Sequence, residues 1–226
     1  MLTIVLAEAA LETIPKQLWK HRSVTKHSRS RDKTPGEMLL DRSFHHSSMM
    51  GIQNAERRGR PDLVHLSLLN TVSTPLYRAD QVKIIVHTVT NKVIILGRSV
   101  RLPKSYFRFE GLMEKLFMDG RDNNTLSDLL ELRTSSFSAL INTIKPSQTI
   151  GLSRVAKNST AQEVARRLSE HKDSLLVVGG FPRGHFSGSV KSSLDDLYSI
   201  HRMPLDTNVV LGRVIYEYEK EVGISH

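Results

Sequence analysis

Short apolar runs alternate along this chain with segments in which apolar residues recur at helical spacing. Leu2–Leu6, Thr149–Leu152 and Leu175–Val178 are such runs, and each is short enough to be a buried strand. Helical patterns from Thr160 to His171 and from Asp206 to Glu221 follow the second and third runs. Strands that alternate with helices form parallel sheets, so the chain is predicted to be an α/β protein with a mainly parallel sheet.

Two β-branched runs lie close together in the first half of the chain. Val82–His87 and Val93–Leu96 are separated by a turn around Asn91-Lys92, which predicts a β-hairpin inserted into the sheet. Further helices are expected from Pro61 to about Pro75, over Tyr106–Met118, over Leu126–Leu132 and over Phe137–Ile144.

The apolar run Leu175–Val178 ends abruptly at Gly179-Gly180. Strand ends followed by glycine turns are places where α/β proteins hold ligands, because glycine lets main-chain groups approach a ligand closely. A tight turn without a ligand fits this stretch taken alone equally well.

The chain of 226 residues carries a formal net charge of +9. Such a basic protein usually meets a polyanion, and nucleic acid is the first candidate, with solubility alone as the alternative. Basic residues crowd the segment Pro15–Lys33, which is predicted to be an exposed, partly mobile loop.

Several function classes are excluded by what the sequence lacks. It has no cysteine, which rules out disulfides, thiolate metal sites and cysteine nucleophiles, and favours a cytoplasmic location. Its histidines have no metal-ligand spacing, so no metal site is predicted. No apolar run approaches the ~20 residues of a membrane span, and Met1–Ala10 lacks the basic start of a signal peptide, so no membrane association is expected.

A basic cluster surrounds Pro103. Arg101 and Lys104 lie on an extended turn, and Arg108 falls in the first turn of the following helix. Free N–H groups at a helix start attract phosphate, so these cations form a candidate phosphate clamp, with Tyr106 and Phe107 available to stack on bases. The alternative is a solvated basic turn whose aromatic residues are buried.

A second basic turn contains Arg60, Pro61 and Asp62. The Asp62 carboxylate is placed to hold the Arg60 guanidinium in one direction through charge-assisted hydrogen bonds. A role for Asp62 as a helix cap is the equally plausible alternative.

Several of these segments, taken together, resemble one family. The segments RRGRPDLVHLSLL, TPLYRA, RLPKSYFRFEGLMEKL, GLS, VVGGFPRG and MPLD occur in the order found in the ribosome-biogenesis methyltransferases of the SPOUT, or α/β-knot, class. Members of that family methylate N1 of a pseudouridine in small-subunit ribosomal RNA. The patterns RPDxxHxSLL and RxPKxxxRFxGLM are specific, whereas GGFPRG alone is weak. The short form without cysteine resembles the archaeal members.

The resemblance implies a single SPOUT domain over residues 1–226, with a C-terminal trefoil knot and an insertion at about 75–108 that carries the hairpin and the basic turn. It implies S-adenosylmethionine as cofactor, Asp62 and Arg60 as catalytic residues, and Arg60, Arg101, Lys104 and Arg108 as RNA contacts. It implies a homodimer that binds small-subunit ribosomal RNA, with other ribosome-assembly factors or ribosomal proteins as further candidate partners. The implied cofactor positions are Leu152, Gly179, Gly184, Ile200, His201, Arg202, Met203, Pro204 and Leu205.

Two positions depart from the family pattern. Lys104 stands where many relatives have arginine, which keeps the charge but loses the bidentate fork, and Arg183 stands where relatives often have histidine. A different function class stays open: an RNA-binding assembly factor of the small ribosomal subunit that does no catalysis. Only the enzyme is expected to bind S-adenosylmethionine and to transfer its methyl group. A DNA-binding protein is disfavoured because no helix-turn-helix or zinc pattern is present.

Overall fold

The computed structural model describes residues 1–98, 100–120 and 129–224. Strands within these residues form one seven-stranded sheet in the order β4-β3-β2-β1-β6-β5-β7. The pairs β1–β2, β1–β6, β5–β6 and β5–β7 are parallel, whereas β2–β3 and β3–β4 are antiparallel, which confirms the predicted mainly parallel sheet and the hairpin. The strands are β1 (Leu2–Ala9), β2 (Val82–Thr88), β3 (Lys92–Leu96), β4 (Leu130–Thr134), β5 (Gln148–Asn158), β6 (Ser174–Gly179) and β7 (Asp196–Ser199).

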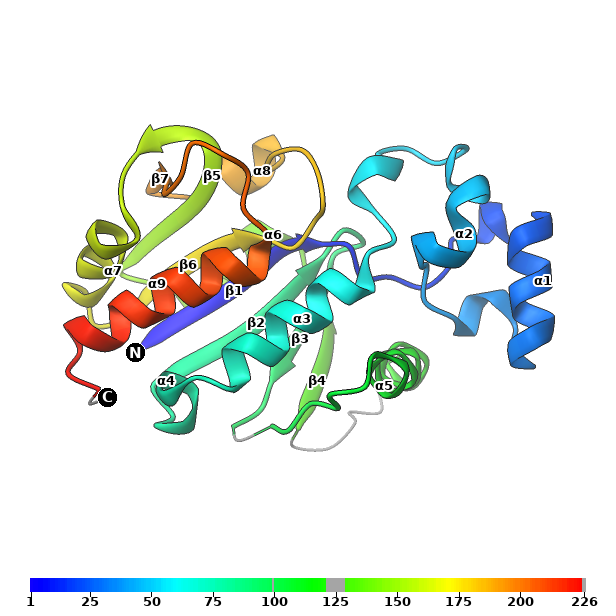
Figure 1. Cartoon of the computed structure of the whole chain (residues 1–226), viewed down its shortest axis with the longest axis horizontal. Helices are drawn as coiled ribbons and strands as arrows, with labels where there is room; N and C mark the ends of the chain where they lie inside the picture. The colour runs from blue at the N-terminus through cyan, green and yellow to red at the C-terminus, as the bar shows by residue number, and fades with distance from the viewer. Residues whose placement is uncertain (99, 121–128, 225–226) are drawn as a thin grey trace.

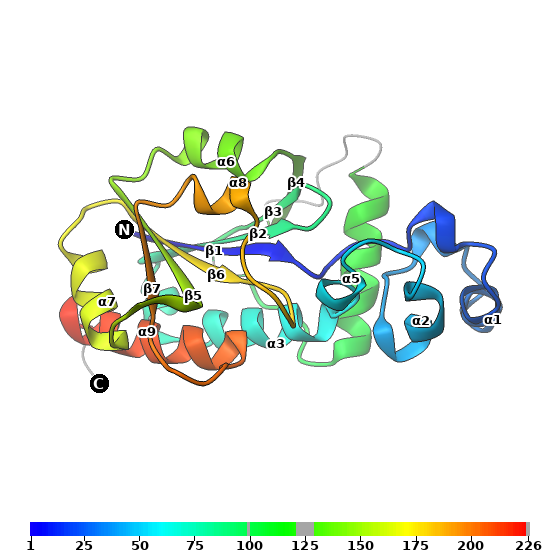
Figure 2. The same ribbon diagram turned by 90° about the horizontal axis from the view of Figure 1, so that it is seen from above.

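Helices cover both faces of the sheet, as Figures 1 and 2 show. One core joins Ile4 and Leu6 of β1 to α3, α5, α7 and α9, and the alternate residues Val5 and Ala7 pack against α6 and α8 on the other face. The α-helices of the described residues are α1 (Arg22–Arg31), α2 (Arg42–Met49), α3 (Pro61–Val72), α4 (Pro75–Arg78), α5 (Tyr106–Asp119), α6 (Phe137–Ile144), α7 (Ala161–Ser169), α8 (Gly188–Lys191) and α9 (Thr207–Glu221), with 3-10 helices η1 (Lys16–Leu18), η2 (Pro35–Glu37) and η3 (Ala55–Arg57).

The basic segment Pro15–Lys33 is not a loop, so this prediction was wrong. It contains η1 and α1, and together with α2 it encloses a small core of its own, to which Leu18, Val24 and Met49 contribute. Arg31 of α1 donates to Glu110 of α5 at 2.9 Å, across 79 residues of sequence. This ion pair with a residue far away in the sequence stabilises α1, whose own composition disfavours a helix.

The helix predicted over Leu126–Leu132 was also wrong where it can be compared. Leu130–Leu132 belong to β4, which pairs with β3 through Leu96 and Leu130. Residues 126–128 lie outside the described residues. A neighbouring strand, which local spacing does not reveal, decides the conformation of this segment.

The C-terminal part of the chain runs from β7 at one edge of the sheet back across to α9. Ser159 N–H donates to the Ser199 carbonyl at 2.8 Å, and Thr207 Oγ1 donates to the Gly179 carbonyl at 2.8 Å, so α9 begins beside the end of β6. The trefoil knot expected for this region stays a prediction. None of the described helices is both long and apolar enough to cross a membrane.

Candidate functional site

The glycine turn after β6 is held tightly to the end of β1. Gly180 N–H donates to the Ala7 carbonyl at 2.9 Å, and Ala10 N–H donates back to the Gly180 carbonyl at 2.8 Å. A Cβ on Gly180 would lie 2.8 Å from the Ala9 Cα, which explains why only glycine fits at this position. The turn therefore fixes where the chain leaves the sheet towards residues 181–187.

Residues 152–154 within β5 and the loops that follow β6 and β7 enclose a cavity of about 500 Å³, here called the C-terminal cavity. Apolar side chains of Leu152, Val178 and Val210 line part of it. A cavity of this size at the carboxyl ends of parallel strands is where open α/β sheets bind ligands.

The structure brings most of the sequence-predicted cofactor residues to this one cavity. Arg202 is an exception: it is exposed and does not line the cavity. Gly184 lines it with a φ of +93°, a conformation that side-chain-bearing residues rarely adopt. The predicted residues that line the cavity are Leu152, Gly179, Gly184, Ile200, His201, Met203, Pro204 and Leu205.

The loops that line the cavity carry main-chain groups without backbone partners. Within the described part of the chain, residues 181–186 and 200–205 form no backbone–backbone hydrogen bonds. The His201 carbonyl accepts from Ser199 Oγ, and the main chain of Met203 contacts the His201 ring. The other N–H and C=O groups of these loops are free of such contacts among the described residues and can bind a ligand, while the apolar side chains can contact a flat ring. This combination fits a nucleoside-type cofactor such as S-adenosylmethionine, which offers donors and acceptors on a purine and a ribose.

The predicted pair Arg60 and Asp62 lies at the start of α3. Arg60 Nε and Nη2 donate to the two carboxylate oxygens of Asp62, both at 2.8 Å. This bidentate contact raises the pKa of Arg60, and weaker attraction from Asp206 and Asp41 adds to the effect. Burial is the largest single influence on Asp62 and raises its pKa. The hydrogen bonds and charge of Arg60, together with the backbone N–H groups of Leu63 and Asp62, outweigh burial and hold that pKa below its usual range. Arg60 N–H donates to the Ala10 carbonyl at 3.2 Å, and Ala10 N–H donates to the Gly180 carbonyl, so Arg60 is joined to the glycine turn at the end of β6.

His65 fixes the turn that carries the other predicted RNA contacts. Its Nε2–H donates to the Pro103 carbonyl oxygen at 2.7 Å, and its ring stacks on Phe109 at a centroid distance of 4.3 Å. His65 is only 5% exposed, so the turn is anchored to α3 from inside.

Arg60, Arg101, Lys104 and Arg108, here called the basic surface, thus lie around the starts of α3 and α5. The last three are exposed, and no ion pair to them occurs among the described residues. Ser105, the N-cap residue of α5, forms no side-chain cap hydrogen bond, and Phe107 beside it is 63% exposed. An uncapped helix start beside unpaired cations and an exposed ring suits phosphates and bases.

Sequence reasoning missed two residues that shape this region. His65 was visible only as a histidine within an apolar helix, which usually marks a core residue. Asp41 caps α2 by accepting from Ser43 N–H at 2.8 Å, and it also accepts from the Tyr106 hydroxyl of α5. An aspartate just before a helical stretch signals a cap, but the link to Tyr106 spans 65 residues and has no local signal.

Comparisons with known proteins give matches over nearly the whole chain. The model of the family described as EMG1/NEP1 methyltransferase matches residues 4–219. A relative named ribosomal RNA small subunit methyltransferase Nep1 from Staphylothermus marinus is 37% identical over 226 residues, covering 100% of this chain and 95% of its own. The protein of the same name from Thermococcus sibiricus is 35% identical and covers 97% and 98%. A crystal structure of Archaeoglobus fulgidus Nep1 bound to S-adenosylhomocysteine matches with a TM-score of 0.85 and 31% identity, covering 98% of each chain.

Proposed function

The chain belongs to the EMG1/NEP1 methyltransferase family, and we propose that it transfers a methyl group from S-adenosylmethionine to N1 of a pseudouridine in small-subunit ribosomal RNA. The observation that carries the proposal is the position of the Arg60–Asp62 pair beside the C-terminal cavity. The loops of the C-terminal cavity bind the donor through their main chain, and the start of α3 presents charged groups that suit RNA.

The residues of this chain have to align two reacting atoms. Bound S-adenosylmethionine would supply a methyl group on a sulfonium: the bond from N1 of pseudouridine to the methyl carbon would form as the carbon–sulfur bond breaks, which releases S-adenosylhomocysteine, and the imide-type proton of N1 would pass to water. Most of the rate gain in such a displacement comes from orientation. Asp62 holds the Arg60 guanidinium in a fixed plane, and that guanidinium is the group best placed to orient the base or to favour its deprotonated form.

The basic surface is proposed to bind the RNA loop that contains the target. Arg101, Lys104 and Arg108 contact phosphates, and the exposed ring of Phe107 stacks on a base that has left its helix. Because His65 anchors the turn, these cations are held in place before RNA arrives, which lowers the entropy lost on binding.

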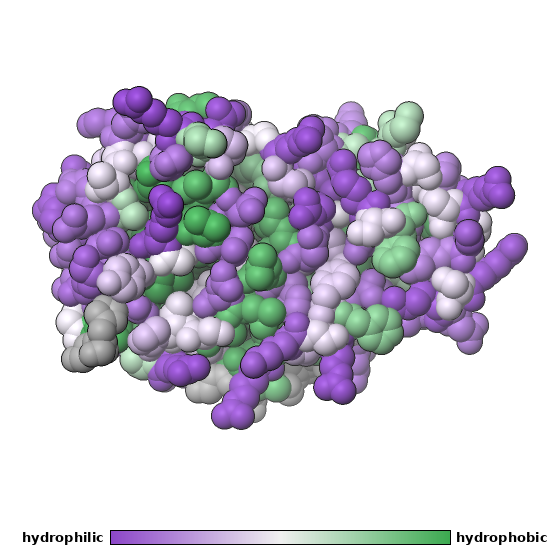
Figure 3. All heavy atoms as spheres, in the orientation of Figure 1, coloured by the Kyte–Doolittle hydropathy of each residue, from purple (hydrophilic) through white to green (hydrophobic). Residues whose placement is uncertain are grey.

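A homodimer is proposed through the outer faces of α3 and α9. Leu66 on α3 is 48% exposed, and Val209 and Tyr216 on α9 are 37% and 52% exposed. These helices are neighbours in the fold, and Figure 3 shows hydrophobic atoms along the boundary between them. Exposed apolar side chains on adjacent helices are typical of a subunit interface. A Leu66→Asp variant is expected to be monomeric in light scattering, whereas the unchanged chain is a dimer.

Two broader expectations accompany this function. A protein that acts on ribosomal RNA during assembly works in the cytoplasm in a cell without a nucleus. Its surface then meets other ribosome-assembly factors or ribosomal proteins on the same RNA.

Calorimetry and a methylation assay test the proposal together. The chain is expected to bind S-adenosylhomocysteine saturably and to methylate an RNA hairpin with pseudouridine in its loop, but not the same hairpin with uridine. RNA binding without binding of S-adenosylhomocysteine would instead indicate a non-catalytic assembly factor. Methylation of both hairpins at the same rate would overturn the assignment of the base.

A further inference from the structure

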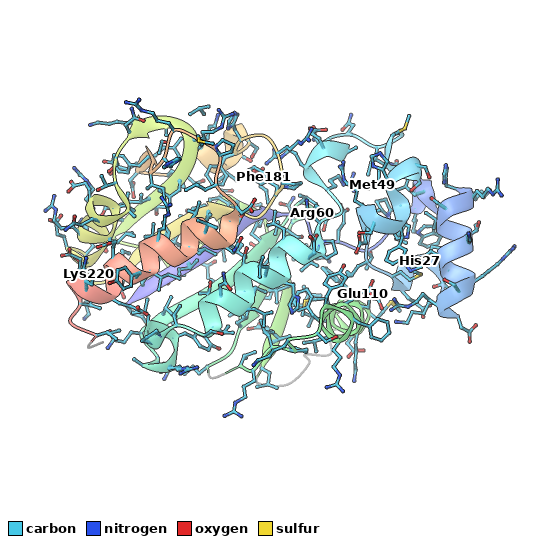
Figure 4. The ribbon with its side chains drawn as sticks, viewed as in Figure 1. His27, Met49, Arg60, Glu110, Phe181 and Lys220 are labelled. Atoms are coloured by element: carbon cyan, nitrogen blue, oxygen red, sulfur yellow. The ribbon has the colours of Figure 1, made fainter. Side chains whose placement is uncertain are left out.

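The side chain of Arg57 crosses from η3 to the wall of the C-terminal cavity. Its guanidinium carbon lies 4.1 Å from the centroid of the Phe181 ring, and a Cβ on Gly184 would be 3.5 Å from its Cδ. The tip of the Phe181 ring in turn lies close to Gly179, and the ring packs edge-on to Phe186 at 5.9 Å. Arg57 therefore packs against Phe181 and Gly184, which themselves line the cavity; Figure 4 labels Phe181 there.

The carboxylate of Glu8 completes the contact. One of its oxygens accepts from Arg57 Nη2 at 2.8 Å and from Ser187 N–H at 3.1 Å. The segment 181–187 is thus held at its start by the glycine turn, along its length by Arg57, and at its end by Glu8. Without these contacts, residues 181–186, which form no backbone–backbone hydrogen bonds, would be free to move.

Glu8 adopts an unusual backbone conformation to reach this position. Its φ is +50°, in the left-handed region that a glutamate rarely occupies, and the pairing of β1 shifts register between Leu6 and Ala9. Both side chains are largely buried, at 16% exposure for Arg57 and 14% for Glu8. Strain of this kind persists where surrounding contacts impose it, and it gathers at functional sites.

We propose that Arg57 and Glu8 are positioning residues that hold segment 181–187 in the shape that binds the cofactor. The inference rests on the proposed function, since it concerns the affinity for S-adenosylmethionine. The two residues do not touch the reacting atoms. They act on the affinity of the C-terminal cavity rather than on the methyl transfer itself.

The geometry requires arginine in particular. The flat guanidinium stacks on Phe181 with one face while an edge nitrogen reaches Glu8, and a lysine ammonium cannot make both contacts in the same way. An Arg57→Lys variant keeps the charge near Glu8 but loses the flat stacking surface. Its effect should therefore lie between those of the unchanged chain and of Arg57→Ala.

The adjacent Arg58 provides a matched control. Its Nε donates to Glu12 Oε1 at 2.6 Å, with 17% and 2% of the two side chains exposed, so it is paired and buried much like Arg57. Its partners are Glu12 and the Gln53 carbonyl, which lie outside segment 181–187. Arg58→Ala thus removes a similar ion pair from the same segment and leaves the cavity wall intact.

The experiment compares these variants by calorimetry with S-adenosylhomocysteine and by urea unfolding. Arg57→Ala and Glu8→Gln are expected to weaken binding by about tenfold or more, and Arg58→Ala by less than about twofold at a similar loss of stability. In the methylation assay, Arg57→Ala should raise KM for S-adenosylmethionine and leave kcat near that of the unchanged chain, because saturation restores the shape of the segment.

Equal weakening by Arg57→Ala and Arg58→Ala, or full affinity in Arg57→Ala, would overturn the inference. If Arg57→Ala does not fold, Arg57→Lys decides: affinity equal to that of the unchanged chain contradicts the positioning role. The proposed function fails in a different way, when the unchanged chain itself does not bind S-adenosylhomocysteine.

Discussion

The C-terminal cavity and the basic surface differ in which atoms they present: main-chain groups in the cavity and side chains on the basic surface. The cavity presents main-chain groups of 181–186 and 200–205, whose position depends on strand ends and a glycine turn. The basic surface presents charged side chains at the starts of two helices. A site made by the main chain should depend on backbone shape, whereas a site made by side chains should depend on which residues are present.

Neutralising the basic surface should give the largest effect. The triple substitution R101Q/K104Q/R108Q removes three phosphate contacts, which is expected to weaken RNA binding by about tenfold per contact and so roughly a thousandfold. The slope of log affinity against log salt should fall by about two, since a single-strand contact contributes about 0.7. Affinity for S-adenosylhomocysteine, measured by calorimetry, should not change; if it fell as well, the two sites would not be separable.

Lowering the pH should destabilise helices α1 and α2 before it affects the C-terminal cavity. His45 is fully buried, its Nδ1 accepts from Asp41 N–H and its Nε2 pairs with His27 at 3.0 Å. Burial, followed by repulsion from His27, lowers its pKa from 6.5 to about 4. The unfolded chain therefore takes up the proton first, and stability that is complete above pH 6.5 is lost as pH falls towards 4.

At about 1.36 kcal/mol per pKa unit, this loss amounts to roughly 3 kcal/mol. Urea unfolding between pH 8 and pH 4 should show it, and a His45→Gln variant, less stable at pH 8, should show a flatter profile. Amide exchange should quicken in α1 and α2 before it does in β6. Equal acceleration of amide exchange in α1, α2 and β6 would contradict a pH effect centred on His27 and His45.

Replacing Gly180 with alanine should distort the C-terminal cavity. Its Cβ would lie 2.8 Å from main-chain and side-chain atoms of Ala9, so Gly180→Ala is expected to lower the free energy of unfolding by about 1–3 kcal/mol and to weaken binding of S-adenosylhomocysteine. Gly188→Ala is the control, because nothing lies within 4 Å of its added Cβ. Chemical denaturation and calorimetry measure the two effects, and equal behaviour of both variants would refute the role of the turn.

Removing the charge of Asp62 should affect turnover more than binding. Asp62→Asn loses one side of the bidentate contact to Arg60 and should lower kcat by about tenfold, while RNA affinity changes by less than about threefold. Single-turnover methylation separates the two quantities. Full turnover with unchanged RNA affinity would remove Asp62 from the mechanism.

Side chains at the cavity rim should matter least. Met203 is 68% exposed, and Met203→Ala is expected to change the affinity for S-adenosylhomocysteine by less than about threefold, since main-chain groups remain in place. A loss as large as that of Gly180→Ala would show that side chains, and not the backbone, bind the cofactor.

Features with a local signal could be predicted from the sequence. The apolar runs of β1 and β6, the hairpin and the proline at the start of α3 were all expected, because hydrophobic spacing and turn residues are short-range patterns. Most of the candidate cavity residues came from the family resemblance, and the structure groups all but Arg202 around one cavity.

Features that depend on distant partners could not be predicted. Helix α1 is held by Arg31 and Lys33 through the buried carboxylates Glu110 and Glu114, which no local pattern links to it. The roles of His65 and Arg57 likewise appear only once α3 meets the Pro103 turn and η3 meets segment 181–187. Such residues look like ordinary polar positions until their partners are known.

The hydrogen bond from Ser187 N–H to Glu8 joins positions 179 residues apart. During synthesis β1 leaves the ribosome early. It cannot form these contacts until β6 and segment 181–187 have also been made. The methyl donor therefore has no binding site on an unfinished chain. Truncated products should be inert towards it, so synthesis of the enzyme has to be almost complete before it can modify the RNA of a new ribosome.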